Sequence, residues 1–186
     1  LLNDFCSKDG PLAKMGMLID TSKILPPIQK LLATARKKNV KVMYLRYTTY
    51  ADHSNVTDAQ VSYQSKTTLK DLNYQPVAVP GTWGWENLPE VAPIEGEPII
   101  PKMRTDGFLQ TSFDLVLRAH NIKTFIIVGI GAEVGIIPTL NTGLSQGYFT
   151  VAPNDCLGLV NPPWIPMEQY LPFIRHFALT PSSAEI

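Results

Sequence analysis

Cysteine is scarce in this sequence. The 186 residues contain two cysteines, Cys6 and Cys156, too few for the disulfide framework of a small secreted domain. A reduced compartment is expected, with the cytoplasm as the default location.

Net charge and long apolar runs are also missing. The 16 Lys and Arg residues balance 16 Asp and Glu residues, so nothing draws the chain to nucleic acid or to an anionic membrane surface, and neither partner is expected. Apolar residues make up 45% of the chain, but runs such as Phe125–Val128 fall far short of the ~18 residues of a membrane span. We expect a soluble, globular protein with one domain over residues 1–186.

The histidines lack the spacing of metal ligands. His53, His120 and His176 are far apart, with no H-x-x-x-H or D-x-H pattern, and we predict no metal site. The glycine-containing stretch 129–135 has neither a dinucleotide fingerprint nor a P-loop lysine. No nucleotide and no other cofactor is therefore predicted.

What the sequence does contain is an alternation of helical and strand patterns. Helices are predicted over 25–38, 111–121 and 133–146, and strands over 40–47, 99–100, 124–128 and 148–152. Asn39 and Asn121 are expected to end the first two helices. Residues 48–98 follow no regular pattern and predict an irregular excursion over a functional site. This order predicts a doubly wound α/β fold, a three-layer α/β/α sandwich with a mostly parallel sheet and ligands at the carboxyl ends of its strands.

The opening residues resemble the end of an element. Leu1–Phe5 reads as the end of a buried strand that runs into a loop, while the strand itself is not in the sequence. We therefore expect that residues upstream of Leu1 supply a first strand.

Two segments are candidates for chemistry. Lys102 directly follows the strand at Ile99–Ile100, which puts its amine at the edge where such folds bind ligands, although a surface lysine beside Arg104 is the alternative. The stretch 128–135 reads as a strand, a glycine turn and a helix start, where free N–H groups form a cradle for an anion or oxyanion. Since any turn from strand to helix favours glycine, this motif alone is weak.

Four motifs in order resemble those of the isochorismatase-like superfamily, which includes isochorismatases, nicotinamidases, N-carbamoylsarcosine amidases and related cysteine hydrolases. Leu2–Phe5 matches the end of the opening D-x-[QL]-N-D-F, and Gly81–Gly84 with Pro89–Pro93 matches G-T-W-G…P-E-[LV]-x-P. The later motifs are K-x-R-x-x-[AG]-F-x-x-T-x-L, with Phe113 where leucine is usual, and G-[IV]-x-[TA]-[DEN]-x-C-V-x-x-T. They are matched by Lys102, Arg104, Gly107, Phe108, Thr111, Gly129, Ile130, Ala132, Glu133 and Thr139. The resemblance covers essentially the whole chain.

The resemblance implies a triad of aspartate, lysine and cysteine. The aspartate falls immediately before Leu1, the lysine on Lys102 and the cysteine on Gly135. Glycine has no thiol, so the family's amidase route through a cysteine nucleophile is not expected. True isochorismatases also resemble this pattern in having glycine there, and their aspartate is thought to protonate the methylene carbon of a vinyl ether. The chain therefore looks like a hydrolase that acts on a small carboxylated or amide-bearing metabolite by a thiol-independent, acid-assisted route; a catalytically inactive ligand-binding or assembly protein is the alternative.

The resemblance also implies further site residues. The backbone N–H groups of Gly131 and Gly135 would form an oxyanion hole, and Glu133 would contact the substrate. Phe5, Trp83 and Phe108 are candidates for the pocket walls, with an ordinary core position as the alternative for each. Isochorismatases usually have Y-A-H-[IV]-G at positions 131–135, so the substrate stays open, and a homo-oligomer is expected as in other members.

Overall fold

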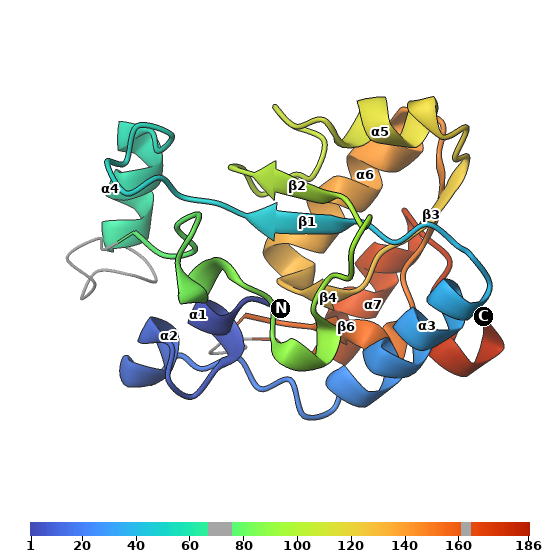
Figure 1. Ribbon diagram of the computed structural model, residues 1–186, viewed down its shortest axis with the longest axis horizontal. Coiled ribbons are helices and arrows are strands. Elements are labelled where there is room, and N and C mark those ends of the chain that lie inside the picture. Colours follow the sequence, from blue (N-terminus) through green and yellow to red (C-terminus); the bar gives the residue numbers. More distant parts are fainter. Residues whose placement is uncertain (67–75, 161–164) are drawn as a thin grey trace.

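A computed structural model describes residues 1–66, 76–160 and 165–186 (Figure 1). Its α-helices are α1 (Asn3–Cys6), α2 (Pro11–Lys14), α3 (Leu25–Lys37), α4 (Asp58–Lys66), α5 (Phe113–Ala119), α6 (Ile137–Ser145) and α7 (Met167–Arg175). The strands are β1 (Tyr44–Tyr47), β2 (Ile99–Lys102), β3 (Thr124–Ile126), β4 (Gly129–Ile130), β5 (Phe149–Val151) and β6 (Leu157–Gly158). Short helical turns complete it: η1 (Trp83–Trp85), η2 (Pro89–Val91), η3 (Ala132–Ile136), η4 (Asn154–Cys156) and η5 (Ser183–Glu185).

The strands form three parallel pairs. β1 pairs with β2, β3 with β5, and β4 with β6. β4 follows β3 after two residues, whereas the helical turn η4 lies between β5 and β6. Parallel neighbours require crossover connections, and α6 supplies one between β4 and β5. The predicted α/β class with parallel strands is confirmed.

Helices cover the strands on two sides. One apolar cluster contains Leu117 of α5, Leu140 of α6 and Ile174 of α7, all at most 1% exposed. A second cluster contains Ile28 of α3 and Cys156. In Figure 1, α5 lies above β1 and β2, α6 runs behind these strands, and α3 lies below them. Strands between two apolar layers are buried on both faces, which explains their continuous apolar runs.

Local predictions differ from the structure where tertiary contacts decide. The strand predicted over 40–47 pairs only from Tyr44 onward, because its neighbour β2 begins at Ile99. Asn3–Cys6 forms a short helix instead of a loop, and the excursion over 48–98 contains α4. The left-handed φ angles of Asn39 (55°) and Asn121 (53°) confirm the predicted helix ends.

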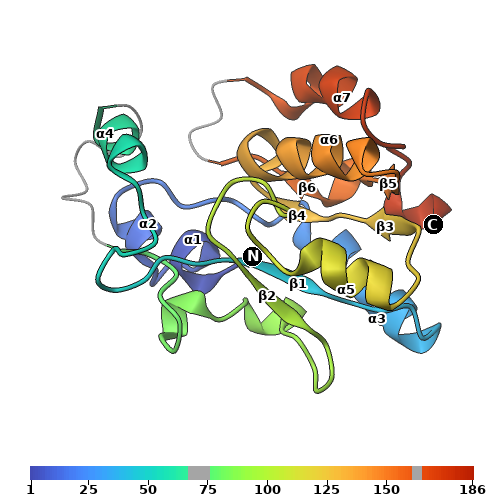
Figure 2. The same ribbon diagram turned by 90° about the horizontal axis from the view of Figure 1, so that it is seen from above.

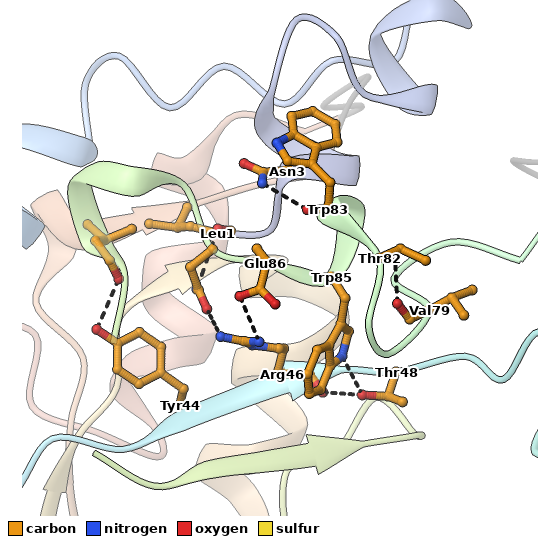
Figure 3. Close-up of polar contacts among 12 residues, drawn as sticks. Leu1, Asn3, Tyr44, Arg46, Thr48, Val79, Thr82, Trp83, Trp85 and Glu86 are labelled. Carbon is orange, nitrogen blue, oxygen red and sulfur yellow. Dashed lines mark hydrogen bonds and ion pairs between the residues drawn. The ribbon is translucent and has the colours of Figure 1, made fainter. Parts of the chain in front are cut away.

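A buried arginine fastens the tryptophan motif to β1 (Figure 3). The guanidinium of Arg46 donates to Oδ1 of Asn87 at 2.7 Å and lies 4.4 Å from the ring centre of Trp85. The indole N–H of Trp85 donates to Oγ1 of Thr48 at 3.0 Å. The next residues of this segment then hold the start of the chain, since the N–H of Leu88 donates to the carbonyl of Leu1 at 2.9 Å. The motif thus fixes where residues 1–3 lie.

Across the part of the chain that the structure describes, no helix combines the length and apolar character that crossing a bilayer requires.

Candidate functional site

The carboxyl ends of β1, β2 and β4 meet at one end of an apolar groove that also runs along residues 40–45 and 124–130. Its volume is about 860 Å³, and its lining includes Tyr47 at the end of β1, Lys102 at the end of β2, and Gly131 and Gly135 after β4. Phe5 lines it from α1. Residues separated by up to 130 positions are thus brought together at the edge where the fold class predicts a ligand.

Lys102 is the charged side chain that stands out at this edge. Its amine donates to the carbonyls of Arg104 and Thr105, both at 2.9 Å, and lies 5.7 Å from the ring centre of Tyr47. Burial lowers its pKa from 10.5 to about 8, although the negative charge of Asp106 partly opposes this shift. The ammonium form has three N–H donors. Two are used by the carbonyls, so the geometry leaves one for a ligand.

The glycine turn after β4 is wound more widely than an α-helix. Gly131 has a φ of +75°, a conformation that favours glycine, and η3 is a π-helical turn. The N–H groups of Val134, Gly135 and Ile136 all converge on the carbonyl of Gly131, at 3.1, 2.6 and 3.1 Å. An oxyanion at this turn would have to compete with that carbonyl for the N–H of Gly135.

Position 135 has room for a side chain beside the lysine. A Cβ atom added to Gly135 would lie 3.7 Å from Nζ of Lys102 and 3.7 Å from the carbonyl oxygen of Thr105, which is ordinary van der Waals contact. The absence of a side chain here therefore opens space next to the amine, and steric crowding does not require it.

Two predicted aromatic site residues lie elsewhere. Phe108 packs in the core, with its ring 4.8 Å from that of Phe113. Trp83 is 53% exposed, and its backbone carbonyl accepts hydrogen bonds from the side chain of Asn3 and from the N–H of Glu86. Neither residue lines the groove. Their aromatic character was a signal for burial or packing, and it did not distinguish core from pocket.

Glu133 is also absent from the lining of the groove. Its Oε1 accepts the N–H of Val160 at 2.8 Å, while Oε2 is buried without a hydrogen-bond partner among the described residues. Burial raises the pKa of this carboxyl group. It is not among the residues that line the groove, so substrate contact by Glu133 stays a prediction without geometric support.

Both thiols lie away from the lysine. Cys6 and Cys156 are buried in the cluster packed around α3 and do not line the groove. Burial raises the pKa of each thiol, that of Cys156 to about 12. Neither has the thiolate character that a nucleophile needs at neutral pH.

Sequence reasoning missed Tyr47 and the carbonyl of Thr105. Tyr47 stands at a strand end, the criterion that singled out Lys102, and applying it to the run 40–47 would have found this residue. The Thr105 carbonyl had no side-chain signal to reveal it. Within residues 1–66, 76–160 and 165–186, no group of three or more His, Cys, Asp or Glu side chains is placed to hold a metal ion.

Comparisons with known proteins agree with this architecture. The isochorismatase domain family model matches residues 2–167. Ureidoacrylate amidohydrolase RutB of Cronobacter turicensis is 25% identical over 169 residues, covering 87% of this chain and 73% of that protein. A cysteine hydrolase from Pseudomonas syringae pv. phaseolicola is 26% identical with a TM-score of 0.80, covering 99% of this chain and 85% of that one. An isochorismatase-like hydrolase from Alkaliphilus metalliredigens, 23% identical, has the same fold with a TM-score of 0.74 over 99% of this chain and 91% of that one.

Proposed function

Because the chain belongs to the isochorismatase domain family, we propose that it hydrolyses a small carboxylated or amide-bearing molecule by an acid-assisted route without a thiol nucleophile. The observation that carries this proposal is the geometry at position 135. Lys102 Nζ lies 3.7 Å from where a Cβ of residue 135 would stand. Position 135 thus has the room and the neighbouring amine that a nucleophilic side chain would need, but glycine provides no such side chain.

Lys102 is assigned to binding and charge stabilisation. With a pKa of about 8, its amine is mostly protonated at pH 7. The N–H left over from its two carbonyl contacts can donate to a substrate carboxylate or to an oxygen that gains negative charge. The apolar lining of the groove lowers the local polarity around the amine, which strengthens this interaction.

An ether-cleaving reaction of the isochorismatase type needs an acid and water only. The acid transfers its proton to the methylene carbon of a vinyl ether, and the electron pair of the C=C bond forms the new C–H bond. Water then adds to the oxygen-stabilised cation and returns a proton to the acid, and the adduct breaks down into a keto acid and an alcohol. The family resemblance assigns the acid to the residue before Leu1, and Leu1 lines the same groove as Lys102 and Gly135.

The names of the relatives suggest further ligands for this chain. A ureidoacrylate carries both a carboxylate and a carbamoyl group, and several relatives are named as hydrolases of it. A carboxylate with an amide or ureido group therefore belongs in any substrate screen. Binding without turnover is the second candidate function, favoured by the glycine at position 135 and by the engagement of Lys102 with two backbone carbonyls.

A ligand screen with a thiol block tests the proposal. Thermal shifts and product formation are measured with a vinyl ether carboxylate, ureidoacrylate, nicotinamide, a carbamoylated amine and an aryl carboxylate, since binding raises the melting temperature whether or not turnover occurs. We expect turnover that iodoacetamide leaves unchanged. Loss of turnover on alkylation would contradict the thiol-independent route, provided that the label maps to Cys6 or Cys156 and that the Cys6→Ala, Cys156→Ala variant keeps its turnover after iodoacetamide treatment. Shifts without any product would favour the binding protein.

The expected homo-oligomer and the cytoplasmic location stay predictions. Sedimentation velocity tests the first, and fractionation of cells that express the protein tests the second.

A further inference from the structure

The position of the Lys102 amine depends on the loop that follows β2. Both carbonyls that accept its hydrogen bonds, those of Arg104 and Thr105, belong to residues 103–108 of this loop. Figure 2 shows the segment between β2 and α5, in yellow-green, reaching up to the first turns of α6, in orange. Position 135 lies in η3, directly before α6. A displacement of the loop relative to α6 would therefore change the distance between the amine and position 135.

One buried hydroxyl group connects the loop to η3. Thr139 of α6 is 1% exposed and lines the groove together with Lys102 and Gly135. Its Oγ1 accepts the N–H of Gly107 at 2.8 Å and donates to the carbonyl of Gly135 at 2.6 Å. A threonine hydroxyl has one donor and two acceptor positions, so this single side chain holds both segments. Thr139 also matches the last position of the fourth sequence motif, and the proposed reaction gives it no part.

The loop packs against Thr139 as closely as glycine permits. A Cβ atom on Gly107 would lie 2.9 Å from Cγ2 and 3.0 Å from Oγ1 of Thr139, and 2.8 Å from Cδ1 of Leu45. The preceding loop residue is held to the same helix, because Oγ1 of Thr142 donates to Oδ2 of Asp106 at 2.6 Å. Residues three positions apart share one face of a helix, so two successive loop residues are fixed on one face of α6.

The two hydrogen bonds of the Thr139 hydroxyl differ in what they connect. Threonine side chains in helices often donate to the carbonyl four residues back, and the bond to Gly135 is of this kind. That bond alone would not affect a distant loop. The bond from Gly107 comes from a residue 32 positions away in the chain, so it is the contact that ties the loop of Lys102 to the helix.

We propose that Thr139 is a positioning residue, whose hydroxyl sets the distance between the Lys102 amine and position 135. This inference rests on the proposed function, in which the amine donates its remaining N–H to a substrate oxygen held beside position 135. A hydrogen bond from the amine requires a distance of about 2.7–3.2 Å between the two heavy atoms. A displacement of the loop by about 1 Å would therefore break it.

The test measures this distance through a thiol at position 135. In Gly135→Cys the ammonium of Lys102 lowers the pKa of the thiol, which the pH dependence of alkylation by iodoacetamide reports. Adding Thr139→Val removes the hydroxyl and nearly keeps the shape of the side chain. A retreat of the amine from ~4 Å to ~6 Å corresponds to about one pKa unit at an effective dielectric constant of ~20, and we expect a rise of this size. Adding Thr139→Ser, which keeps the hydroxyl, should leave the thiol pKa as it is in Gly135→Cys.

The matched control is Thr150→Val in the same Gly135→Cys background. Thr150 is 6% exposed, its hydroxyl donates to the carbonyl of Phe177, and it does not line the groove. Loss of this buried hydrogen bond should lower the urea midpoint. It should not change the thiol pKa, because Thr150 does not touch the loop of Lys102.

An unchanged thiol pKa on adding Thr139→Val would make Thr139 a merely structural residue and overturn the proposal. So would an equal rise in the Thr150→Val control, or a thiol pKa near ~8.5 in Gly135→Cys itself. If the Thr139→Val variant does not fold, Gly107→Ala replaces it, because its Cβ pushes the loop away from Thr139: the same rise supports the proposal, and no rise overturns it. The thiol pKa does not depend on turnover, so failure here is distinguishable from failure of the proposed hydrolysis.

Discussion

Replacing Gly135 with cysteine tests whether position 135 is a usable nucleophile site beside Lys102. A Cβ fits there at 3.7 Å from Nζ of Lys102, so the variant Gly135→Cys should fold. A thiolate about 4 Å from an ammonium gains about 4 kcal/mol at an effective dielectric constant of ~20, or about 3 pKa units. The carbonyl oxygen of Thr105, also 3.7 Å away, opposes part of this gain. We therefore expect the thiol pKa to fall from ~8.5 to about 6.

The rate of alkylation by iodoacetamide reports this pKa. At pH 6, a thiol with a pKa of about 6 is half ionised, roughly 160 times more than free cysteine, while its lower basicity reduces its intrinsic reactivity about 13-fold. Net labelling of position 135 should then be about tenfold faster than that of free cysteine at pH 6. Above pH 8 the order should reverse, because both thiols are ionised and the less basic one reacts more slowly.

The control is the same cysteine without the neighbouring charge. In Gly135→Cys, Lys102→Met, the thiol pKa should return to about 8.5 and the advantage at pH 6 should vanish. Cys6 and Cys156 provide a slow background because both are buried. A thiol pKa near 8.5 in the single variant, or the same pKa in both variants, would refute the placement of Lys102 beside position 135.

Three other perturbations follow from the geometry. Lys102→Met should weaken binding of any carboxylate ligand at least tenfold, because one charge-assisted hydrogen bond is lost, and it should not lower the melting temperature of the free protein. If the ligand raises the melting temperature of the variant as much as that of the parent, Lys102 does not belong to the site. The same variant should alter the pH dependence of folding. In the parent chain the pKa of Lys102 is about 8 when folded and 10.5 when unfolded, so the unfolded chain holds more protons between pH 8 and 10.5. The free energy of unfolding of the parent should therefore rise with pH by at most about 3 kcal/mol across this window. Urea melts should show the rise in the parent and not in Lys102→Met, and parallel curves would contradict it. Gly84→Ala should cost about 1–3 kcal/mol, because its Cβ would lie 1.9 Å from Oδ1 of Asp4, whose carboxylate accepts the N–H of Ala78 at 2.6 Å. Gly135→Ala is the matched control, because its Cβ would be in ordinary van der Waals contact. Equal stability of the two alanine variants would show that Asp4 moves aside without cost and would contradict this prediction.

Local patterns were enough for the elements and for part of the site. Alternating strand and helix patterns predicted the parallel α/β class, and asparagine after two helices predicted their ends. Lys102 was identified because a residue that directly follows a strand in such a fold stands at the ligand edge. The missing thiol at position 135 also needed no structure, since it is a property of residue identity. In each case the signal lies within a few residues of the feature.

Tertiary structure decided which residues face one another. Phe108 and Trp83 carry equal aromatic signals, yet one packs in the core and the other is half exposed, because the outcome depends on contacts with distant residues. The lowered pKa of Lys102 depends on burial beneath elements far along the chain. The 3.7 Å approach of Lys102 to position 135 joins residues 33 positions apart on separate elements. Sequence by itself thus determined which chemical groups this protein has. Only the packing of distant segments decided the distances between these groups and their charge states, because both are set by neighbouring residues that no local pattern specifies.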